Sequence, residues 1–132
     1  MSISERTRAG NDFERWLARE FAETGGFTVV AILVQIGETL VTPLRSTYFN
    51  VIGDDVDWSD IVVMFAGAGA EWDGAAFFPV VASDGGPLDN STARVRLRDL
   101  EMKINDDLLV INEGQFFDKW GRHVKIEEVA RQ

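Results

Sequence analysis

A glycine-rich stretch is the first candidate for chemistry in this sequence. The stretch AGAGAEWDGAAFF, residues 66–78, follows the apolar run IVVMF. A dinucleotide-binding loop needs three glycines in the spacing G-x-G-x-x-G and a helix after them to hold the pyrophosphate. Trp72 occupies the third glycine position, acidic residues flank it, and the residues that follow resemble a strand. We therefore expect no nucleotide here and interpret Asp73-Gly74 as a hairpin turn.

An acidic cluster is the second candidate, and it comprises Asp54, Asp55, Asp57 and Asp60. An EF-hand loop counted from Asp55 needs glycine at its sixth position and glutamate at its twelfth, where this chain has Asp60 and Ala66. A non-standard calcium loop over 54–60 remains one interpretation. The other is a solvated loop in which Asp60 helps to start the next element.

His123 is the single histidine, and the chain has no cysteine. These counts exclude thiolate metal sites, disulfides and a cysteine nucleophile. No residue stands out as catalytic, so we expect a protein that is not an enzyme and that has no cofactor and no metal. A small-molecule site or a small enzyme stays an alternative, with a pocket lined by Trp16, Phe77 and Phe78.

A basic series stands out against the acidic composition: Arg94, Arg96 and Arg98 alternate with apolar residues. On a strand they would share one face and bind an anion or a carboxylate-bearing partner, or pair with nearby acids. Together with Trp120 and Arg122, they form the partner surface that the sequence predicts.

The composition limits the class of protein. The 132 residues are enough for one domain, 45% of them are hydrophobic, and the formal net charge is −9. Such a negative surface repels nucleic acid, because affinity for nucleic acid comes largely from cationic contacts. The first residues contain no apolar segment of a signal peptide, and the longest apolar run, FTVVAILVQI, is too short to cross a bilayer. We expect a cytoplasmic protein with no membrane insertion.

The first elements have clear signals. A helix is predicted over 11–24, because Asn11 and Glu14 fit a capping box and a glycine pair follows. Strands are predicted over 27–36 and 39–45, with a turn at Gly37-Glu38 between them. Pro43 predicts a free edge or a bulge in the second strand.

The rest of the chain is predicted to be rich in strands, at 61–65, 75–81, 92–104, 108–111, 116–117 and 123–129. Over 92–104 the apolar residues alternate and then change phase at Arg98-Asp99, which indicates a bulge in a bent strand. Apolar residues are expected at an edge that joins subunits of a homo-oligomer: Leu109, Ile111, Val124 and Ile126.

These elements resemble the Sm-like barrel, a helix followed by five bent strands. The residues that carry the resemblance are Gly37, Leu44, the triplet Leu97-Arg98-Asp99 and the triplet Lys119-Trp120-Gly121. Residues 47–91 would be a large β-hairpin insertion, an arrangement similar to that of the gas vesicle accessory protein GvpU, which also has a pair like Tyr48-Phe49. Thr42 departs from the family, which has glycine there.

The resemblance implies a mostly β (α+β) single domain over 1–132, with an N-terminal helix region at 1–26. It also implies a protein partner and self-assembly, as in a gas-vesicle-type accessory protein. An Sm-like RNA-binding protein is the alternative that the family implies, but the residues of the uridine pocket depart from the family at Arg94 and Trp120.

Overall fold

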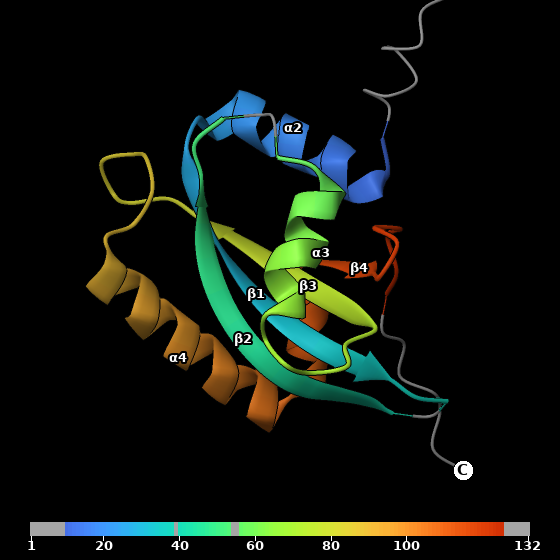
Figure 1. Cartoon of the computed structure of the whole chain (residues 1–132). Helices are drawn as coiled ribbons and strands as arrows, with labels where there is room; N and C mark the ends of the chain where they lie inside the picture. Colours follow the sequence, from blue (N-terminus) through green and yellow to red (C-terminus); the bar gives the residue numbers. More distant parts are fainter. Residues whose placement is uncertain (1–9, 39, 54–55, 126–132) are drawn as a thin grey trace, which may run out of the picture.

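A computed structural model describes residues 10–38, 40–53 and 56–125. The elements in chain order are helix α2 (Asp12–Thr24), strands β1 (Phe27–Ile36) and β2 (Val41–Val51), helix α3 (Trp58–Ala66), strand β3 (Gly74–Val80), helix α4 (Asn90–Asp106), the 3₁₀ helix η1 (Leu108–Glu113) and strand β4 (Gln115–Asp118) (Figure 1). The fold is α+β, with one antiparallel four-stranded sheet in the order β2-β1-β3-β4. None of the helices in these ranges combines the length and apolar character needed to span a membrane.

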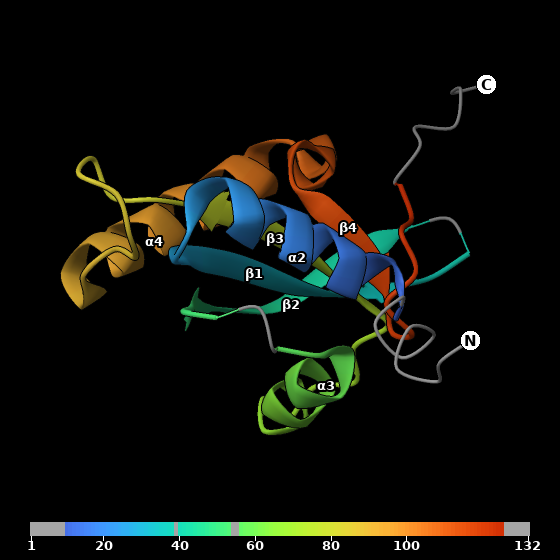
Figure 2. The same cartoon turned by 90° about the horizontal axis from the view of Figure 1, so that it is seen from above.

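Helices cover both faces of the sheet, and this explains why β1 is an uninterrupted apolar run. The odd-numbered residues of β1, such as Val29 and Leu33, pack with α2 and α3. The even-numbered residues Ile32 and Val34 pack with α4 and η1 on the second face. In Figure 2, α3 and α4 lie on opposite sides of the sheet.

Aromatic rings fill the first face around Phe77 of β3, which is fully buried. The ring of Phe13 lies 4.9 Å from that of Phe77, and Phe65 stacks on it at 6.0 Å. Trp16 and Phe117 lie at 6.2 and 5.9 Å. Aromatic pairs at these separations contribute packing energy beyond their buried area.

The early elements agree with the prediction. Asn11 and Glu14 form a capping box at α2, and the helix ends at Gly25, whose φ is +73°. Gly37 donates its backbone N–H to the carbonyl of Leu40 in the β1–β2 turn. Pro43 lies in edge strand β2 at a register shift opposite Leu33/Val34, so the predicted edge and bulge are both confirmed.

The predicted bent strand over 92–104 is wrong, because these residues form most of α4. The side chains on the inner face are Ala93, Leu97, Leu100 and Ile104, spaced at four, three and four residues. That is the period of a helix. Val95, which the alternation places with them, is 52% exposed. The change of phase at Arg98-Asp99, which indicated a bulge, therefore arises because apolar residues repeat every 3.6 residues and not every 2.

Three shorter predictions are corrected as well. Residues 61–65 belong to α3, where Trp58, Ile61 and Phe65 share the buried face. Residues 108–111 form η1 rather than a strand. Asp73-Gly74 is not a hairpin turn, because it joins a helix to β3.

The Sm-like barrel with a hairpin insertion is not the arrangement of the described residues. β3, which comes from the expected insertion 47–91, lies inside the sheet between β1 and β4. The sheet has two edges, and no ladder in the described part of the chain joins β2 to β4. Of the predicted strand 123–129, only an isolated bridge between His123 and Phe117 is described, and residues 126–129 lie outside the described ranges.

Candidate functional site

The tight turn over residues 118–123, here called the tryptophan turn, presents an exposed aromatic ring on a well-anchored backbone. The almost buried side chain of Asp118 holds the turn together. The carboxylate accepts hydrogen bonds from the backbone N–H groups of Trp120 at 2.9 Å and Arg122 at 3.0 Å, and from Arg122 Nε at 2.7 Å. Gly121 closes the turn at φ +79°, where residues with a side chain are strained.

The start of α2 and the start of α3 bind this turn through its carbonyls. Trp58 Nε1 donates to the carbonyl of Lys119 at 2.8 Å. Asn11 Nδ2 donates to the carbonyl of Trp120 at 3.1 Å, and the backbone N–H of Phe13 donates to that of Gly121 at 3.0 Å. Three consecutive carbonyls are thus satisfied by segments distant in sequence, so the backbone under Trp120 is held in one conformation.

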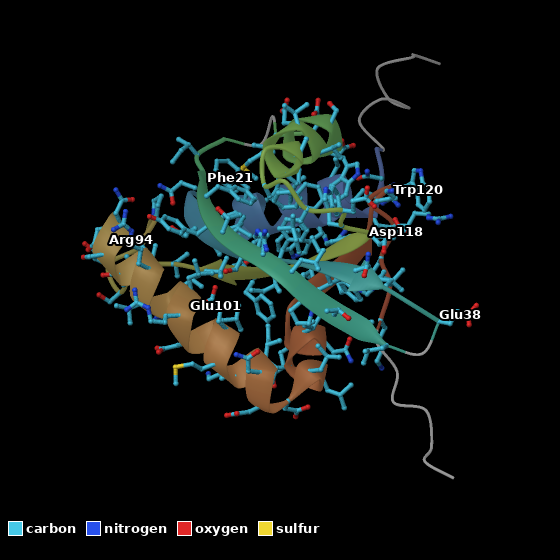
Figure 3. All side chains as sticks on the ribbon, turned by 60° about the horizontal axis from the view of Figure 1, so that its bottom comes forward. Phe21, Glu38, Arg94, Glu101, Asp118 and Trp120 are labelled. Atoms are coloured by element: carbon cyan, nitrogen blue, oxygen red, sulfur yellow. The ribbon has the colours of Figure 1, made fainter. Side chains whose placement is uncertain are left out.

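Trp120 itself points outward and is 63% exposed. The guanidinium of Arg122 lies 5.0 Å from the centre of the indole ring, which is within cation–π range. Figure 3 shows Trp120 at the periphery of the molecule, above Asp118. Tryptophan and arginine are the residues most enriched in the energetic centres of protein interfaces.

Basic side chains surround the tryptophan turn. Lys119, Lys125 and His123 are exposed in or directly after the turn. Next to it, a cleft of about 380 Å³ opens between α2 and β4, with Arg15 and Arg19 from the helix among its lining residues. This part of the surface carries cationic groups on a chain whose net charge is −9.

Asp12 is the acidic residue in that cleft, and its charge already has partners. Its carboxylate accepts the backbone N–H of His123 at 2.8 Å and forms an ion pair with Arg15. The hydrogen bond from His123 and the pairing with Arg15 lower the pKa of Asp12. Asp12 therefore stays ionised and ties the end of the turn to α2.

The partner surface predicted from the sequence is divided by the fold. All three arginines of the basic series lie exposed on α4, where residues two apart point in different directions. Figure 3 places Arg94 and Trp120 at opposite ends of the molecule. Of the five predicted residues, the structure brings together only Trp120 and Arg122.

The predicted oligomer edge is corrected. Ile111 is fully buried, and Val124 packs against the same second-face core as Ile111. Leu109 lies in η1 and is half-buried, and Ile126 lies outside the described residues. These residues were expected at an edge because short apolar runs were interpreted as strands.

The other candidates have structural roles. Trp16 and Phe77 meet in the first-face core, whereas Phe78 lies on the second face, so the three do not line one pocket. Asp57 caps α3 with Asp60 as its capping-box partner, which confirms that Asp60 helps to start the next element. Asp54 and Asp55 lie outside the described ranges. No cluster able to hold a metal ion occurs in the described part of the chain.

The glycine-rich stretch follows a helix and leads into β3, as the strand-like residues after it predicted. Its Asp73 accepts the backbone N–H of Ile36 at 2.8 Å and so fastens the loop to the end of β1. The arrangement in which a helix N-terminus follows the loop is absent here.

Sequence reasoning missed the role of Asp118 and the docking of the turn on α2. A local signal for the turn exists, because an aspartate three residues before a glycine favours a turn stabilised by its own side chain. No local signal exists for the contact with Asn11, which lies 109 residues away along the chain.

Comparison of the chain with protein-family models, with curated proteins and with solved structures finds no match.

Proposed function

We propose that this protein is a non-catalytic protein-binding module that recognises its partner through the tryptophan turn. The observation that carries the proposal is the exposure of Trp120 on a backbone that three carbonyl hydrogen bonds hold in place. A large apolar ring on a fixed backbone segment requires little backbone ordering when it binds, so little conformational entropy is lost.

The chemistry around the ring defines the partner. An indole ring fits an apolar pocket, and the cationic side chains beside it, such as Lys119 and Arg19, favour acidic residues around that pocket. The cationic groups beside the ring give this surface a positive potential on a chain whose net charge is −9, so it attracts an acidic partner.

Selection from a random peptide display library tests the proposal. We expect the wild-type protein to enrich peptides that combine acidic residues with large apolar residues, and Trp120→Ala to abolish this enrichment. Met102→Ala, which removes an exposed apolar side chain on α4, is the matched control and should enrich the same peptides. A consensus that survives Trp120→Ala would exclude the turn as the recognition element.

The separation of the α4 arginines from Trp120 and Arg122 favours protein binding over the RNA-binding alternative. In an Sm-like uridine pocket the positions of Arg94 and of Trp120-Gly121 would meet, and here they lie at opposite ends (Figure 3). We expect uridine-rich oligomers to bind weakly or not at all at low salt, where cationic contacts are strongest. A role as a gas-vesicle-type accessory protein is compatible with a protein-binding module and stays a prediction.

Self-association is a second proposal, and the edge that favours it is β2. β2 pairs with β1 along one side, and no other described strand pairs with it on the other side. The outer edge of β4, by contrast, is occupied by the chain itself, because Val124 donates its backbone N–H to Phe116. An unpaired edge is a template for a second copy.

Light scattering tests this second proposal. We expect a species larger than the 14.7 kDa monomer, and we expect the edge substitution Thr42→Lys to convert it to monomer, because edge lysines oppose strand pairing. Met102→Lys adds the same charge on α4 and should leave the oligomer intact. A wild-type monomer at high micromolar concentration would rule out this interface.

A further inference from the structure

The second face of the sheet is incompletely covered. α4 contacts β1 and β2, whereas η1 contacts β3 and β4. Between them lies a cleft of about 430 Å³, within the size range of small-ligand sites.

The floor of the cleft is apolar. Val30 of β1 and Phe78 of β3 are register partners on adjacent strands and lie side by side there. Val80 extends the floor along β3, and Leu100 and Val110 form the lower walls. The apolar surface open to a ligand belongs to the half-buried Phe78 and Val80, since Val30 is only 1% exposed.

The rim carries charges of both signs. Arg96, Asp99 and Lys103 are spaced at three and four residues, so they follow one face of α4 along one wall. Glu113 of η1 belongs to the opposite wall. None of these four side chains forms a hydrogen bond or an ion pair with another described residue, so each is available to a ligand.

We propose that this cleft binds a zwitterion with an apolar side chain, that is, an apolar α-amino acid or a short apolar peptide with free ends. A carboxylate would meet Arg96 and Lys103, an ammonium would meet Asp99 and Glu113, and the side chain would cover Phe78 and Val80. An anion or a cation alone would leave two rim charges facing a like charge, which disfavours it. The site is separate from the tryptophan turn, and it does not depend on the function proposed for the turn.

Two-dimensional NMR of the full chain, titrated with defined probes, tests the inference. L-phenylalanine and L-leucine should give saturable shifts at the amides of Val30, Phe78 and Val110. Phenylpropionate lacks the ammonium and phenethylamine lacks the carboxylate, and we expect each to bind at least about tenfold more weakly. Titration with the dipeptide leucyl-leucine distinguishes a peptide ligand from a free amino acid. Tighter binding than that of leucine indicates a peptide, and weaker binding indicates the free amino acid.

Variants at the rim complete the test. Arg96→Gln and Glu113→Gln should each weaken phenylalanine binding about tenfold, while Arg94→Gln, on the same helix but outside the cleft, should leave it unchanged. All three positions are exposed, so we expect each variant to fold, which the unchanged amide shifts elsewhere verify. Absence of saturable shifts at tens of millimolar phenylalanine would overturn the proposal, and so would equal binding of the zwitterion and the single ions.

Discussion

At the scale of single residues, the candidate binding surface depends on Asp118 and Gly121, neither of which was predicted to hold the turn. Asp118 supplies three hydrogen bonds within the tryptophan turn, and Gly121 supplies a backbone conformation that other residues resist. The exposed Trp120 between them makes no such bond through its side chain with any other described residue. Its usefulness as an anchor therefore depends on the neighbours that hold its backbone.

Gly121→Ala should destabilise the protein by about 1–3 kcal/mol. The added Cβ would strain the backbone at φ +79° and lie 2.1 Å from Asn11 Nδ2, so the hydrogen bond of Asn11 to the turn would also be disturbed. Urea denaturation measures the loss. Gly69→Ala is the control, because Gly69 has φ +72° but no atom within 4 Å of the added Cβ. An equal loss in both variants would show that the contact with Asn11 contributes nothing.

Asp118→Asn should cost about 1.5–3 kcal/mol, the usual contribution of a hydrogen bond to a charged group. Asparagine keeps one oxygen, which can still accept the two backbone N–H groups. Its amide nitrogen, however, would face Arg122 Nε, so two hydrogen-bond donors would point at each other. Thermal unfolding measures the change. Asp107→Asn is a matched control, because Asp107 caps η1 at an exposed position and asparagine caps equally well. A neutral Asp118→Asn would mean that the ion pair with Arg122 is dispensable.

At the scale of elements, α3 and α4 are helices whose sequences also resemble strands. Each begins at an aspartate whose side chain accepts a backbone N–H from the first turn, Asp57 for α3 and Asp89 for α4. The capping residue and the buried face agree on a helix, whereas β-branched and alternating apolar residues favour a strand. Packing against the sheet decides in favour of the helix because only the 3.6-residue period buries a continuous stripe.

The buried face of α4 gives a direct test. Ile104→Ala should cost about 2–5 kcal/mol, because the side chain is 4% exposed in the second-face core. Met102→Ala should change stability by less than about 0.5 kcal/mol, since Met102 is 61% exposed. On a strand these two side chains would share a face, so comparable losses in chemical denaturation would contradict the helix.

The cap of α3 predicts a dependence on pH. Hydrogen bonds from Ser59 and from the backbone of Asp60 lower the pKa of Asp57 below its usual 3.8. A carboxyl with a lowered pKa in the folded state contributes stability above pH 3.8, and this contribution is lost as the pH falls through the folded-state pKa. Asp57→Ala should lose about 1 kcal/mol at neutral pH. Asp57→Asn should keep the cap and flatten this part of the acid denaturation profile measured by circular dichroism, and an unchanged profile would remove Asp57 from the acid response.

At the scale of the whole molecule, one strand organises everything else. β1 pairs on both sides and is buried on both faces over residues 27–34, so every layer of the fold contacts it. The tryptophan turn and the cleft beside α2 lie at the margins of this arrangement, whereas the second-face cleft opens over β1 and β3 between α4 and η1. The proposed binding sites thus lie where the helices stop covering the sheet, whereas the buried residues of β1 contribute most to stability.

Hydrogen exchange should reproduce this hierarchy. Amides in the middle of β1, such as that of Ala31, should exchange only through global unfolding, with protection equal to the free energy measured by denaturant. In the monomeric Thr42→Lys variant, amides at the open end of β2 near residue 42 should exchange faster through local opening, because β2 is then an uncovered edge strand with a bulge there. If the amides near residue 42 were as protected as that of Ala31, the β2 edge would be covered, as in the self-associated form.

The elements whose signals are local could be predicted from the sequence. The capping box at Asn11, the apolar run 27–36, the turn at Gly37 and the disruption at Pro43 each act within a few residues, so α2, β1 and the hairpin with β2 could be predicted. That 92–104 forms a helix depends on tertiary packing, because a short apolar pattern fits periods of both 2 and 3.6 residues, and the surface against which it packs selects the side chains to bury. The candidate site depends on it as well, since Asn11 and Trp120 meet although 109 residues separate them, and no local pattern encodes their contact.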